Sequence, residues 1–232
     1  MKIKIFADGA RLDDMLAAYR GRVVSGFTTN PTLMHQAGIT DYEAFARNVL
    51  ASIKDVSISF EVFADDEETM TAQARKIAAW GSNVYVKIPV TNTQQKSMTS
   101  LIRELSHEGI SLNVTAILTL DQVRNVVAAL SPSTPAIVSV FAGRIADTGR
   151  DPVPLMSEAL KICAQRPKAE LLWASPREVL NIYQAEEIGC HIITVTSDLL
   201  KKLALRDKDL AAYSLDTVKM FYNDAKAAGF EL

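Results

Sequence analysis

The sequence predicts an α/β fold in which eight parallel strands alternate with helices and close into a barrel. Short β-branched runs alternate with longer segments of helical period along the chain, and this order implies parallel pairing through crossover helices. The 232 residues lie near the low end of the length that eight such units require. We therefore expect a (β/α)8 TIM barrel, a single domain over residues 1–232.

An open, doubly wound parallel sheet is the alternative fold, because it shows the same alternation of strands and helices. Such sheets often carry a G-x-G-x-x-G turn after the first strand, where a dinucleotide binds. Here that turn reads Ala7-Asp8-Gly9-Ala10-Arg11, without the glycine pattern. The barrel is therefore preferred over the open sheet.

The expected strands are short apolar runs, and the expected helices are the amphipathic stretches between them. The strands are Lys2–Phe6, Val23–Gly26, Ser57–Val62, Val84–Ile88, Ser111–Thr115, Ala136–Phe141, Glu170–Trp173 and His191–Val195. The clearest helices are Glu67–Ala79, Thr93–His107, Leu120–Ala129, Pro152–Gln165 and Pro176–Ile188. Gly81, Gly109 and Gly189 each follow a helical stretch and precede a strand, as is typical of helix C-termini.

The segment Leu215–Ala228 has the pattern of an extra C-terminal helix beyond the last strand unit. It has no strand to cover, so we expect its apolar face to pack on a partner subunit. This pattern favours a homo-oligomer.

The composition excludes several classes of protein. A formal net charge of -2 argues against nucleic acid or an anionic membrane as the main partner. No apolar run approaches the roughly 20 residues that span a bilayer, and Met1 leads directly into a strand pattern. Cys163 and Cys190 stand far apart inside apolar segments, where buried thiols are expected rather than a disulfide. We expect a soluble cytoplasmic protein.

Polar residues stand at or just past the ends of the expected strands. In a parallel barrel, the C-terminal strand ends surround the active site. These residues are Asp8, Thr28, Asn30, Glu61, Lys87, Asn113, Thr115, Ser139, Arg144, Ser175, Arg177 and Thr194. Polar residues placed at random would not gather at one end of their strands, so this pattern predicts the site.

Lys87 interrupts the otherwise apolar run from Val84 to Val90. Burial of an unpaired ammonium is very costly and favours the neutral amine. A neutral amine is what a Schiff-base nucleophile requires. The alternative is a structural lysine that pairs with a buried carboxylate.

Two carboxylates are expected at the same barrel mouth. Asp8 follows the first strand, and Glu61 interrupts the apolar run from Ile58 to Phe63. A general acid or base beside a forming carbinolamine moves protons between hydroxyl, water and amine. The alternatives are a helix N-cap for Asp8 and a structural salt bridge with Lys87 for Glu61.

Arg144 and Arg177 are candidates for an anion clamp. Two opposed guanidinium groups suit a phosphate or sulfonate. Pro176 is placed as the first residue of a helix whose N-terminus would also attract an anion. Solvation at the surface is the alternative for each arginine.

No metal site is expected. His35, His107 and His191 show no spacing typical of metal ligands, and no cluster of His, Cys and carboxylate residues occurs in the sequence. We also expect no organic cofactor, because a protonated imine on Lys87 would itself accept electrons.

Four segments together resemble the motif series of transaldolases and fructose-6-phosphate aldolases. They are Gly26-Phe27-Thr28-Thr29-Asn30-Pro31-Thr32, Val84-Tyr85-Val86-Lys87-Ile88-Pro89-Val90-Thr91, Leu112-Asn113-Val114-Thr115-Ala116 and Ser139-Val140-Phe141-Ala142-Gly143-Arg144. Their order and their placement on expected strand ends agree with that family from Asp8 to Arg177. The short C-terminal helix resembles its compact branch.

The resemblance implies a role for each matching position. Lys87 would be the Schiff-base lysine, Asp8 the acid/base of carbon–carbon cleavage, and Glu61 and Thr115 would hold the catalytic water with Asp8. Residues implied to surround and orient the sugar hydroxyls are Thr28, Asn30, Asn113 and Ser139. Arg144, Ser175 and Arg177 would form the phosphate site.

Two positions favour the transaldolase branch over the aldolase branch. The resemblance implies that an aldolase would usually have glutamine at position 61 and tyrosine at position 141. This chain has Glu61 and Phe141, as in transaldolases. A phenol could help to protonate a free enamine and release dihydroxyacetone, whereas phenylalanine cannot. Val140, Trp173 and the segment from Thr194 to Ser197 depart from the family pattern, and we expect all of them to border the anion end.

The expected activity is transfer of a dihydroxyacetone unit from a ketose phosphate similar to fructose 6-phosphate to an aldose phosphate, as in the pentose phosphate pathway. The alternatives are an aldolase that releases dihydroxyacetone, a transaldolase for a modified sugar such as a sulfonated one, and a catalytically silent sugar-phosphate binding protein. The expected partners are thus small sugar phosphates. The resemblance also implies a pentameric or decameric ring.

Overall fold

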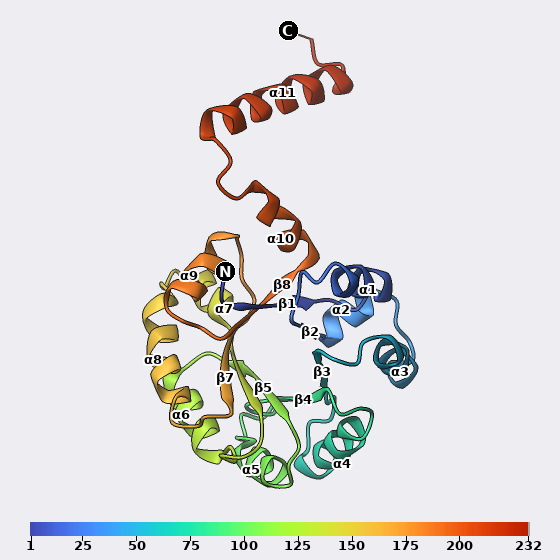
Figure 1. The fold of residues 1–232 in the computed structure, drawn as a ribbon, viewed down its shortest axis with the longest axis vertical. Coiled ribbons are helices and arrows are strands. Elements are labelled where there is room, and N and C mark those ends of the chain that lie inside the picture. Colours follow the sequence, from blue (N-terminus) through green and yellow to red (C-terminus); the bar gives the residue numbers. More distant parts are fainter. Residues whose placement is uncertain (232) are drawn as a thin grey trace. The chain divides into compact units, whose positions relative to one another are not determined.

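The computed structural model describes residues 1–231 and divides into two compact units, Met1–Leu200 and Lys201–Leu232. The larger unit holds a closed barrel of eight parallel strands in sequence order (Figure 1). The strands are β1 (Lys4–Asp8), β2 (Gly26–Thr28), β3 (Ser57–Glu61), β4 (Val84–Pro89), β5 (Leu112–Ile117), β6 (Ala136–Val140), β7 (Ala169–Trp173) and β8 (Ile192–Thr196). The predicted fold class is confirmed.

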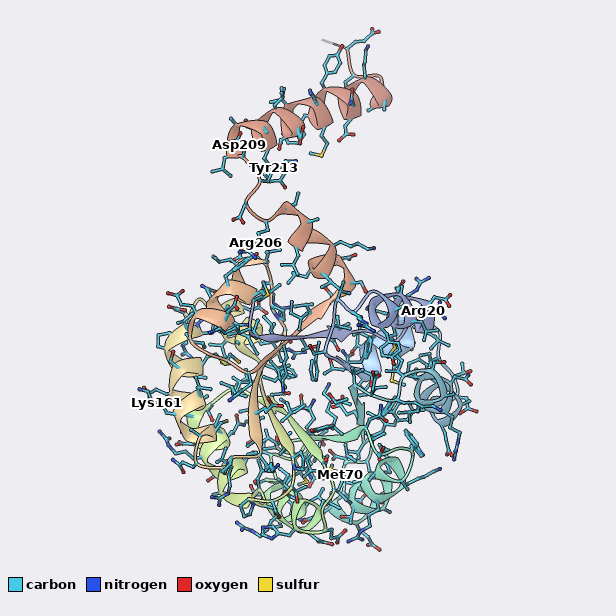
Figure 2. The ribbon with its side chains drawn as sticks, in the orientation of Figure 1. Arg20, Met70, Lys161, Arg206, Asp209 and Tyr213 are labelled. Carbon is cyan, nitrogen blue, oxygen red and sulfur yellow. The ribbon has the colours of Figure 1, made fainter. Side chains whose placement is uncertain are left out.

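Helices surround the barrel as an outer ring (Figure 1). They are α1 (Leu12–Arg20), α2 (Pro31–Gln36), α3 (Tyr42–Ser52), α4 (Glu67–Ala78), α5 (Thr99–His107), α6 (Leu120–Ala129), α7 (Ala142–Asp147), α8 (Val153–Cys163) and α9 (Leu180–Glu187). Figure 2 shows Arg20 and Lys161 on the outside of this ring, whereas Met70 of α4 is fully buried. Amphipathic helices therefore cover the strands, as the helical periodicity predicts.

Several helices begin at side-chain caps that the sequence supplies. Asp41 accepts a hydrogen bond from the backbone N–H of Ala44 at the start of α3, and Asp66 does the same for α4. Thr119 and Gln122 form a reciprocal capping box at α6. Each such cap contributes about 1 kcal/mol by satisfying backbone donors that the helix leaves free.

Buried apolar side chains, most of them large, fill part of the barrel interior. This cluster contains Phe6, Ile137, Leu172, Ala174 and Ile192. The Phe6 ring occupies the space where a Cβ at Gly26 would stand, because that atom would lie 2.6 Å from the ring. Each large side chain buried here stabilises the fold by about 1.5–3 kcal/mol.

The second strand was predicted wrongly at Val23–Gly26, since β2 spans Gly26–Thr28. Pairing with β1 sets its position, with Gly26 opposite Phe6 and Thr28 opposite Asp8. Val23 is 51% exposed, so its β-branched run lies in the connection after α1. Registry with β1 therefore outweighs local β-propensity.

Two helix starts were also predicted too early. α5 begins at Thr99 rather than Thr93, because Thr91 pairs with Ser97 in an antiparallel bridge and Gln95 has a φ of +63°. α9 begins at Leu180, so Pro176 is not its first residue. The expected anion-binding helix N-terminus at Pro176 is thus wrong.

The smaller unit continues from α10 (Ser197–Lys202) through a 3-10 turn (Leu203–Leu205) to α11 (Leu210–Ala228). Asp209 caps the start of α11, and Gly229 ends it with a φ of +68°. The helix contains the predicted segment 215–228 and has no buried residue. Figure 2 shows Tyr213 among its side chains. Its exposed large apolar residues are Leu210, Tyr213, Leu215, Val218, Met220, Phe221 and Tyr222.

Within residues 1–231, no helix combines the length and the apolar character needed to cross a bilayer.

Candidate active site

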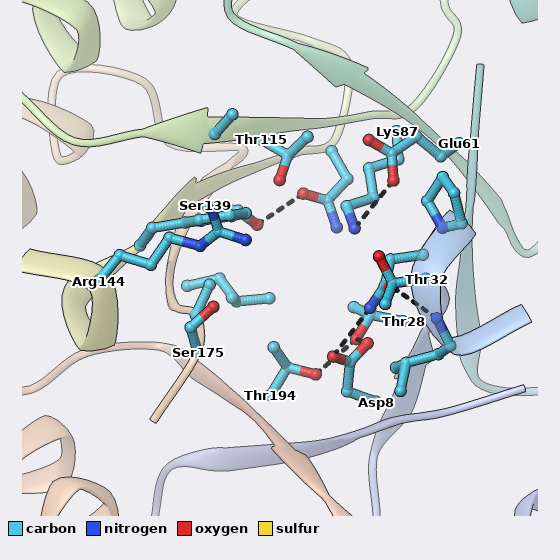
Figure 3. A pocket seen from close by; sticks show the side chains of 18 of the residues that line it. Asp8, Thr28, Thr32, Glu61, Lys87, Thr115, Ser139, Arg144, Ser175 and Thr194 are labelled. Atoms are coloured by element: carbon cyan, nitrogen blue, oxygen red, sulfur yellow. Dashed lines mark hydrogen bonds and ion pairs between the residues drawn. The ribbon is translucent and has the colours of Figure 1, made fainter. Parts of the chain in front are cut away.

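The C-terminal strand ends surround one cavity of about 470 Å³ (Figure 3). All the predicted site residues line it except Arg177. The lining residues are Asp8, Thr28, Asn30, Pro31, Thr32, Leu33, Gln36, Glu61, Lys87, Asn113, Thr115, Ala116, Ser139, Phe141, Arg144, Leu172, Ala174, Ser175 and Thr194. Side chains that lie far apart in the sequence therefore converge where the barrel topology predicts.

Lys87 lies in the cavity wall opposite Glu61 of the neighbouring strand. The two residues are paired in the β3–β4 register, so both side chains point to the same face. The Lys87 Nζ lies 3.3 Å from a Glu61 carboxylate oxygen and donates a hydrogen bond of 3.0 Å to the Thr29 carbonyl. Lys87 is only 8% exposed. The salt bridge between Lys87 and Glu61, which the sequence offers as the alternative to a catalytic role, is thus present, and both side chains line the open cavity.

Asp8 faces this pair from the end of β1 (Figure 3). It accepts hydrogen bonds from the Thr28 hydroxyl at 2.8 Å and from the Asn30 side-chain amide at 3.3 Å. Burial raises the pKa of Asp8, and the charge of Lys87 and these two hydrogen bonds partly oppose the rise. A carboxylate of raised pKa is a stronger base, as proton abstraction from a hydroxyl requires.

Thr28 and Asn30 contact Asp8 directly, which the sequence did not show. Asn30 also accepts a hydrogen bond from the Leu33 backbone N–H at the start of α2, so its amide is held at both ends. The hydroxyls of Thr28 and Thr194 lie 2.5 Å apart. Because Thr28 donates to Asp8, Thr194 must donate to Thr28. Thr194 thereby extends the hydrogen-bond chain that orients Asp8.

A second polar network crosses the barrel below Thr115. The Asn113 amide donates to the Ser59 hydroxyl at 2.9 Å and accepts from the Ser139 hydroxyl at 2.6 Å. All three side chains are buried. Among the described residues the buried Thr115 hydroxyl has no protein hydrogen-bond partner, and it lines the cavity. The protein therefore leaves the hydrogen-bonding capacity of this hydroxyl unused.

Arg144 and Ser175 stand on the other side of the cavity from Asp8 and Lys87 (Figure 3). Arg144 belongs to the short helix α7, and its guanidinium lies 5.2 Å from the centre of the Phe141 ring. Ser175 has a φ of +56°, in the left-handed region. A Cβ at Gly143 would lie 1.5 Å from the Ser175 carbonyl oxygen, so only glycine lets α7 and this loop come together. The cation is thus held at the cavity by close backbone packing.

The structure does not place Arg177 in the cavity wall. Its guanidinium forms a two-point ion pair with Asp147 at the end of α7. The loop before α9 directs it there, because the Asn181 side chain accepts the Arg177 backbone N–H at 2.8 Å. Hydrogen bonding by Arg177 lowers the pKa of Asp147. Arg144 therefore lines the cavity without the expected second arginine.

Two of the three departures from the family pattern do not line the cavity, although each precedes a residue that does. Val140 and Trp173 are fully buried and are not among the residues that line it. Thr194 does line it, on the side of Asp8 (Figure 3). The bulk of Trp173 is thus accommodated in the packed interior of the barrel wall.

Comparison with known proteins places the chain in a family. The model described as Transaldolase/Fructose-6-phosphate aldolase matches residues 5–232. The chain belongs to this family. A probable transaldolase of Dehalococcoides mccartyi is 34% identical over 218 residues, covering 92% of the chain and 97% of that protein. One of Thermoanaerobacter sp. is 32% identical over 231 residues, covering 99% and 100%.

Solved structures share the barrel fold with this transaldolase-family chain at low identity. A 3-hexulose-6-phosphate synthase from Salmonella typhimurium has a TM-score of 0.58 and 17% identity, covering 85% of the chain and 89% of its own. A dihydrodipicolinate synthase from Rhodopseudomonas palustris has a TM-score of 0.57 and 15% identity, covering 96% and 79%. These similarities support the fold alone.

Several side chains around the site of this family member could not be read from its sequence. Thr32, Leu33 and Gln36 line the cavity because α2 begins at its rim. Asp147 follows Arg144 by three residues on α7, and this acidic neighbour is a signal that sequence reasoning missed. Across residues 1–231, no group of three or more His, Cys, Asp or Glu side chains is arranged to hold a metal ion.

Proposed function

We propose that this protein is a transaldolase that moves a dihydroxyacetone unit from a ketose phosphate to an aldose phosphate through a Schiff base on Lys87. One observation carries the proposal. A nearly buried amine lies 3.3 Å from the Glu61 carboxylate at the wall of an open cavity, with Asp8 facing both. Family membership supports the same chemistry at a coarser level.

The first step joins substrate and enzyme. Once the ion-pair proton has passed from Lys87 to Glu61, the neutral amine attacks the ketone carbon, and the carbonyl oxygen takes up a proton to become the hydroxyl of a carbinolamine. Glu61 lies close enough to accept the proton that the nitrogen gives up. That hydroxyl then leaves as water, with protons supplied by Glu61 or Asp8 and with the water held by Thr115. The product is a protonated imine.

The second step breaks the bond between the third and fourth carbons. Asp8 removes the proton of the hydroxyl on the fourth carbon, an aldehyde forms there, and the bonding electrons move to the imine nitrogen. The three-carbon unit remains on Lys87 as an enamine. A second aldehyde then accepts this unit, Asp8 returns the proton, and water hydrolyses the new imine. No external electron acceptor is needed in this sequence.

The substrate lies across the cavity in this proposal. Arg144 and Ser175 bind the phosphate, on the side opposite Asp8 and Lys87. The polar network of Asn113 and Ser139 faces the sugar hydroxyls together with Thr28 and Asn30. Arg177 does not contact the phosphate in this proposal while its guanidinium remains paired with Asp147.

Transfer is favoured over simple cleavage because no phenol stands at position 141. Phe141 lines the cavity and its ring lies under Arg144, so it supplies no proton to the enamine. Assays with and without an acceptor aldehyde separate the two activities. Release of dihydroxyacetone without acceptor, at a rate comparable to transfer, would instead identify a fructose-6-phosphate aldolase.

Borohydride trapping tests the covalent step. Incubation with fructose 6-phosphate and borohydride should yield a reduced adduct that peptide mapping places on Lys87. Lys87→Ala should form none, and Lys96→Ala, which removes an exposed lysine paired with Glu67, should form as much as wild type. An adduct of normal yield in Lys87→Ala would reject the proposal. Binding of the sugar without any adduct in the wild type would indicate a silent sugar-phosphate binding protein.

The proposed function extends to the location, the partners and the subunit number of the protein. We expect a cytoplasmic homo-oligomer that acts on small sugar phosphates, or on sulfonated analogues if Arg144 accepts them. The exposed apolar residues of α11 favour contact with another copy of the chain. Mass measurement in solution tests the number of subunits, for which a pentamer or decamer is the expectation.

A further inference from the structure

We propose that Tyr42 is a positioning residue for Glu61, and that its phenol replaces a missing strand partner at the end of β3. The inference rests on the proposed function of Glu61 as the proton acceptor beside Lys87. Tyr42 does not line the cavity and thus acts through Glu61 rather than on the substrate.

The hydrogen bonding of β3 shows which partner is missing. Ile58 and Val62 donate their backbone N–H groups toward β4, to Asn83 and Lys87. In a parallel sheet successive residues point their backbone groups to opposite sides, so Glu61 points its N–H and C=O toward β2. The β2–β3 register ends at Thr28 and Ser59, and Thr29 gives the last ladder bond, to the Ser59 carbonyl. The chain then enters α2, which leaves Glu61 without a neighbour.

The Tyr42 hydroxyl takes this place. It accepts a hydrogen bond from the Glu61 N–H at 2.7 Å and donates one to the Glu61 C=O at 3.0 Å. A paired parallel strand would offer the same one acceptor and one donor, from two of its residues. Burial and the charge of Glu61 raise the pKa of Tyr42, so its hydroxyl keeps the proton that it donates.

An aromatic cluster fixes the ring that carries this hydroxyl. The Tyr42 ring centre lies 4.6 Å from that of Phe63, 5.5 Å from that of Trp80 and 6.1 Å from that of Phe60. Phe60 and Phe63 flank Glu61 in the sequence, so the cluster and the hydroxyl hold the same segment. Figure 1 shows α3, which begins at Tyr42, in the helical ring beside β3.

The Tyr42 phenol thereby helps to set the distance over which Glu61 and Lys87 exchange a proton. Glu61 is the last residue of β3, and its carboxylate must stay near the Lys87 amine, which lies 3.3 Å away. Without the phenol, two backbone groups of Glu61 lose their partners and the strand end is free to shift. A displacement of about 1 Å at a catalytic group can slow a reaction by roughly 100-fold.

The test is Tyr42→Phe, which keeps the ring and removes only the hydroxyl. The rate of borohydride-trapped imine formation and kcat should each fall by about 10- to 100-fold, while KM changes by less than about threefold. In a Glu61→Gln background, the same substitution should lower the trapping rate by less than about threefold, because both changes act on one proton transfer.

Two control variants separate positioning from general packing. Phe63→Leu weakens the aromatic cluster but keeps the phenol and its two hydrogen bonds to Glu61, so it should lower Tm and reduce kcat by less than about threefold, well below the loss in Tyr42→Phe. Tyr19→Phe removes a hydroxyl whose 2.5 Å hydrogen bond to Asp55 is exposed, and it should change neither. Wild-type rates in Tyr42→Phe, equal losses in Phe63→Leu, or additive losses with Glu61→Gln would overturn the inference alone. No adduct in the wild type would overturn the proposed function and this inference together.

Discussion

In the proposed mechanism, Lys87, Glu61 and Asp8 form a covalent end of the cavity, which three strands carry. Arg144 and Ser175 form an anion end, which a short helix and a loop carry. The side chains of Lys87 and Glu61 are 10% and 17% exposed, but those of Arg177 and Asp147 beside the anion end are 48% and 50% exposed. Strand register fixes the first set of groups, while the second depends on local turns and surface pairing. The chemical step should thus be sensitive to single atoms at the covalent end, and the anion end should tolerate more change.

Asp8→Asn gives the largest expected effect after loss of Lys87 itself. Asparagine cannot take the proton of the substrate hydroxyl, so kcat should fall by about 10²- to 10⁴-fold. The adduct on Lys87 should still be detectable by borohydride trapping, because the amine and Glu61 remain. Asp121→Asn, which changes an exposed carboxylate paired with Arg124, is the matched control and should behave as wild type. Turnover above a tenth of wild type in Asp8→Asn would remove Asp8 from the mechanism.

Arg144→Ala sharpens the comparison from the other end. Loss of one charge-assisted contact to phosphate should raise KM for a phosphorylated ketose by about 10- to 100-fold and change kcat less. An unphosphorylated ketose makes no such contact, so its kcat/KM should stay near the wild-type value. Arg150→Ala, in the loop after α7, is the control. A kcat/KM loss that is equal for both substrates would mean that Arg144 supports the fold rather than the anion.

The covalent end is also the part that could be predicted from sequence. Lys87, Glu61 and Asn113 interrupt apolar runs, and a period of two places them on the inner face once strands are assumed. The barrel rule then brings their strand ends together without any further information. The pairing of Glu61 with Lys87 follows once β3 and β4 are taken as neighbouring strands of similar length.

The anion end could not be predicted in the same way. The direction of Arg177 depends on where α9 begins, and a proline before an apolar stretch favoured Pro176 over the observed Leu180. The partner of Arg177, Asp147, lies 30 residues away in the sequence and is chosen by the packing of α7 on the loop. Tyr42 was missed for the same reason, because its role arises only where β2 turns away from β3.

Arg177→Ala tests whether the second arginine matters. An exposed ion pair already satisfies its guanidinium, so its loss should raise KM for the phosphorylated ketose by less than about fivefold. Asp147→Asn should lower KM slightly, because it releases the same guanidinium toward the cavity. If Arg177→Ala raised KM as much as Arg144→Ala, the arginine must turn inward when substrate binds, and both cations would form the anion end.

The smallest expected effect is on stability, and it isolates the burial of Asp8. Because burial raises its pKa in the folded chain, Asp8 binds its proton more tightly there than in the unfolded chain. The stability that this proton contributes is complete below the unfolded value of 3.8 and is lost as the pH rises through the raised folded value. Asp8→Asn has no such proton to lose. Its Tm relative to wild type should therefore increase between pH 4 and pH 7, by about 2–4 °C if the change is about 1 kcal/mol.

The pH dependence of this difference is more informative than its absolute size. The asparagine at position 8 can still accept a hydrogen bond from the Thr28 hydroxyl, but its NH2 group would face the NH2 group of Asn30. These two donors cannot bond to each other, so the substitution lowers the stability of the fold by a similar amount at every pH. Other titrating groups are shared by the two proteins, so they largely cancel from the difference. A Tm difference that stayed constant or shrank toward pH 7 would show that the hydrogen bonds of Asp8 outweigh its burial. The hydrogen bonds of Thr28 and Asn30 would then stabilise the charged Asp8 carboxylate more than burial destabilises it. Asp8 would lack the raised pKa that makes it a stronger base.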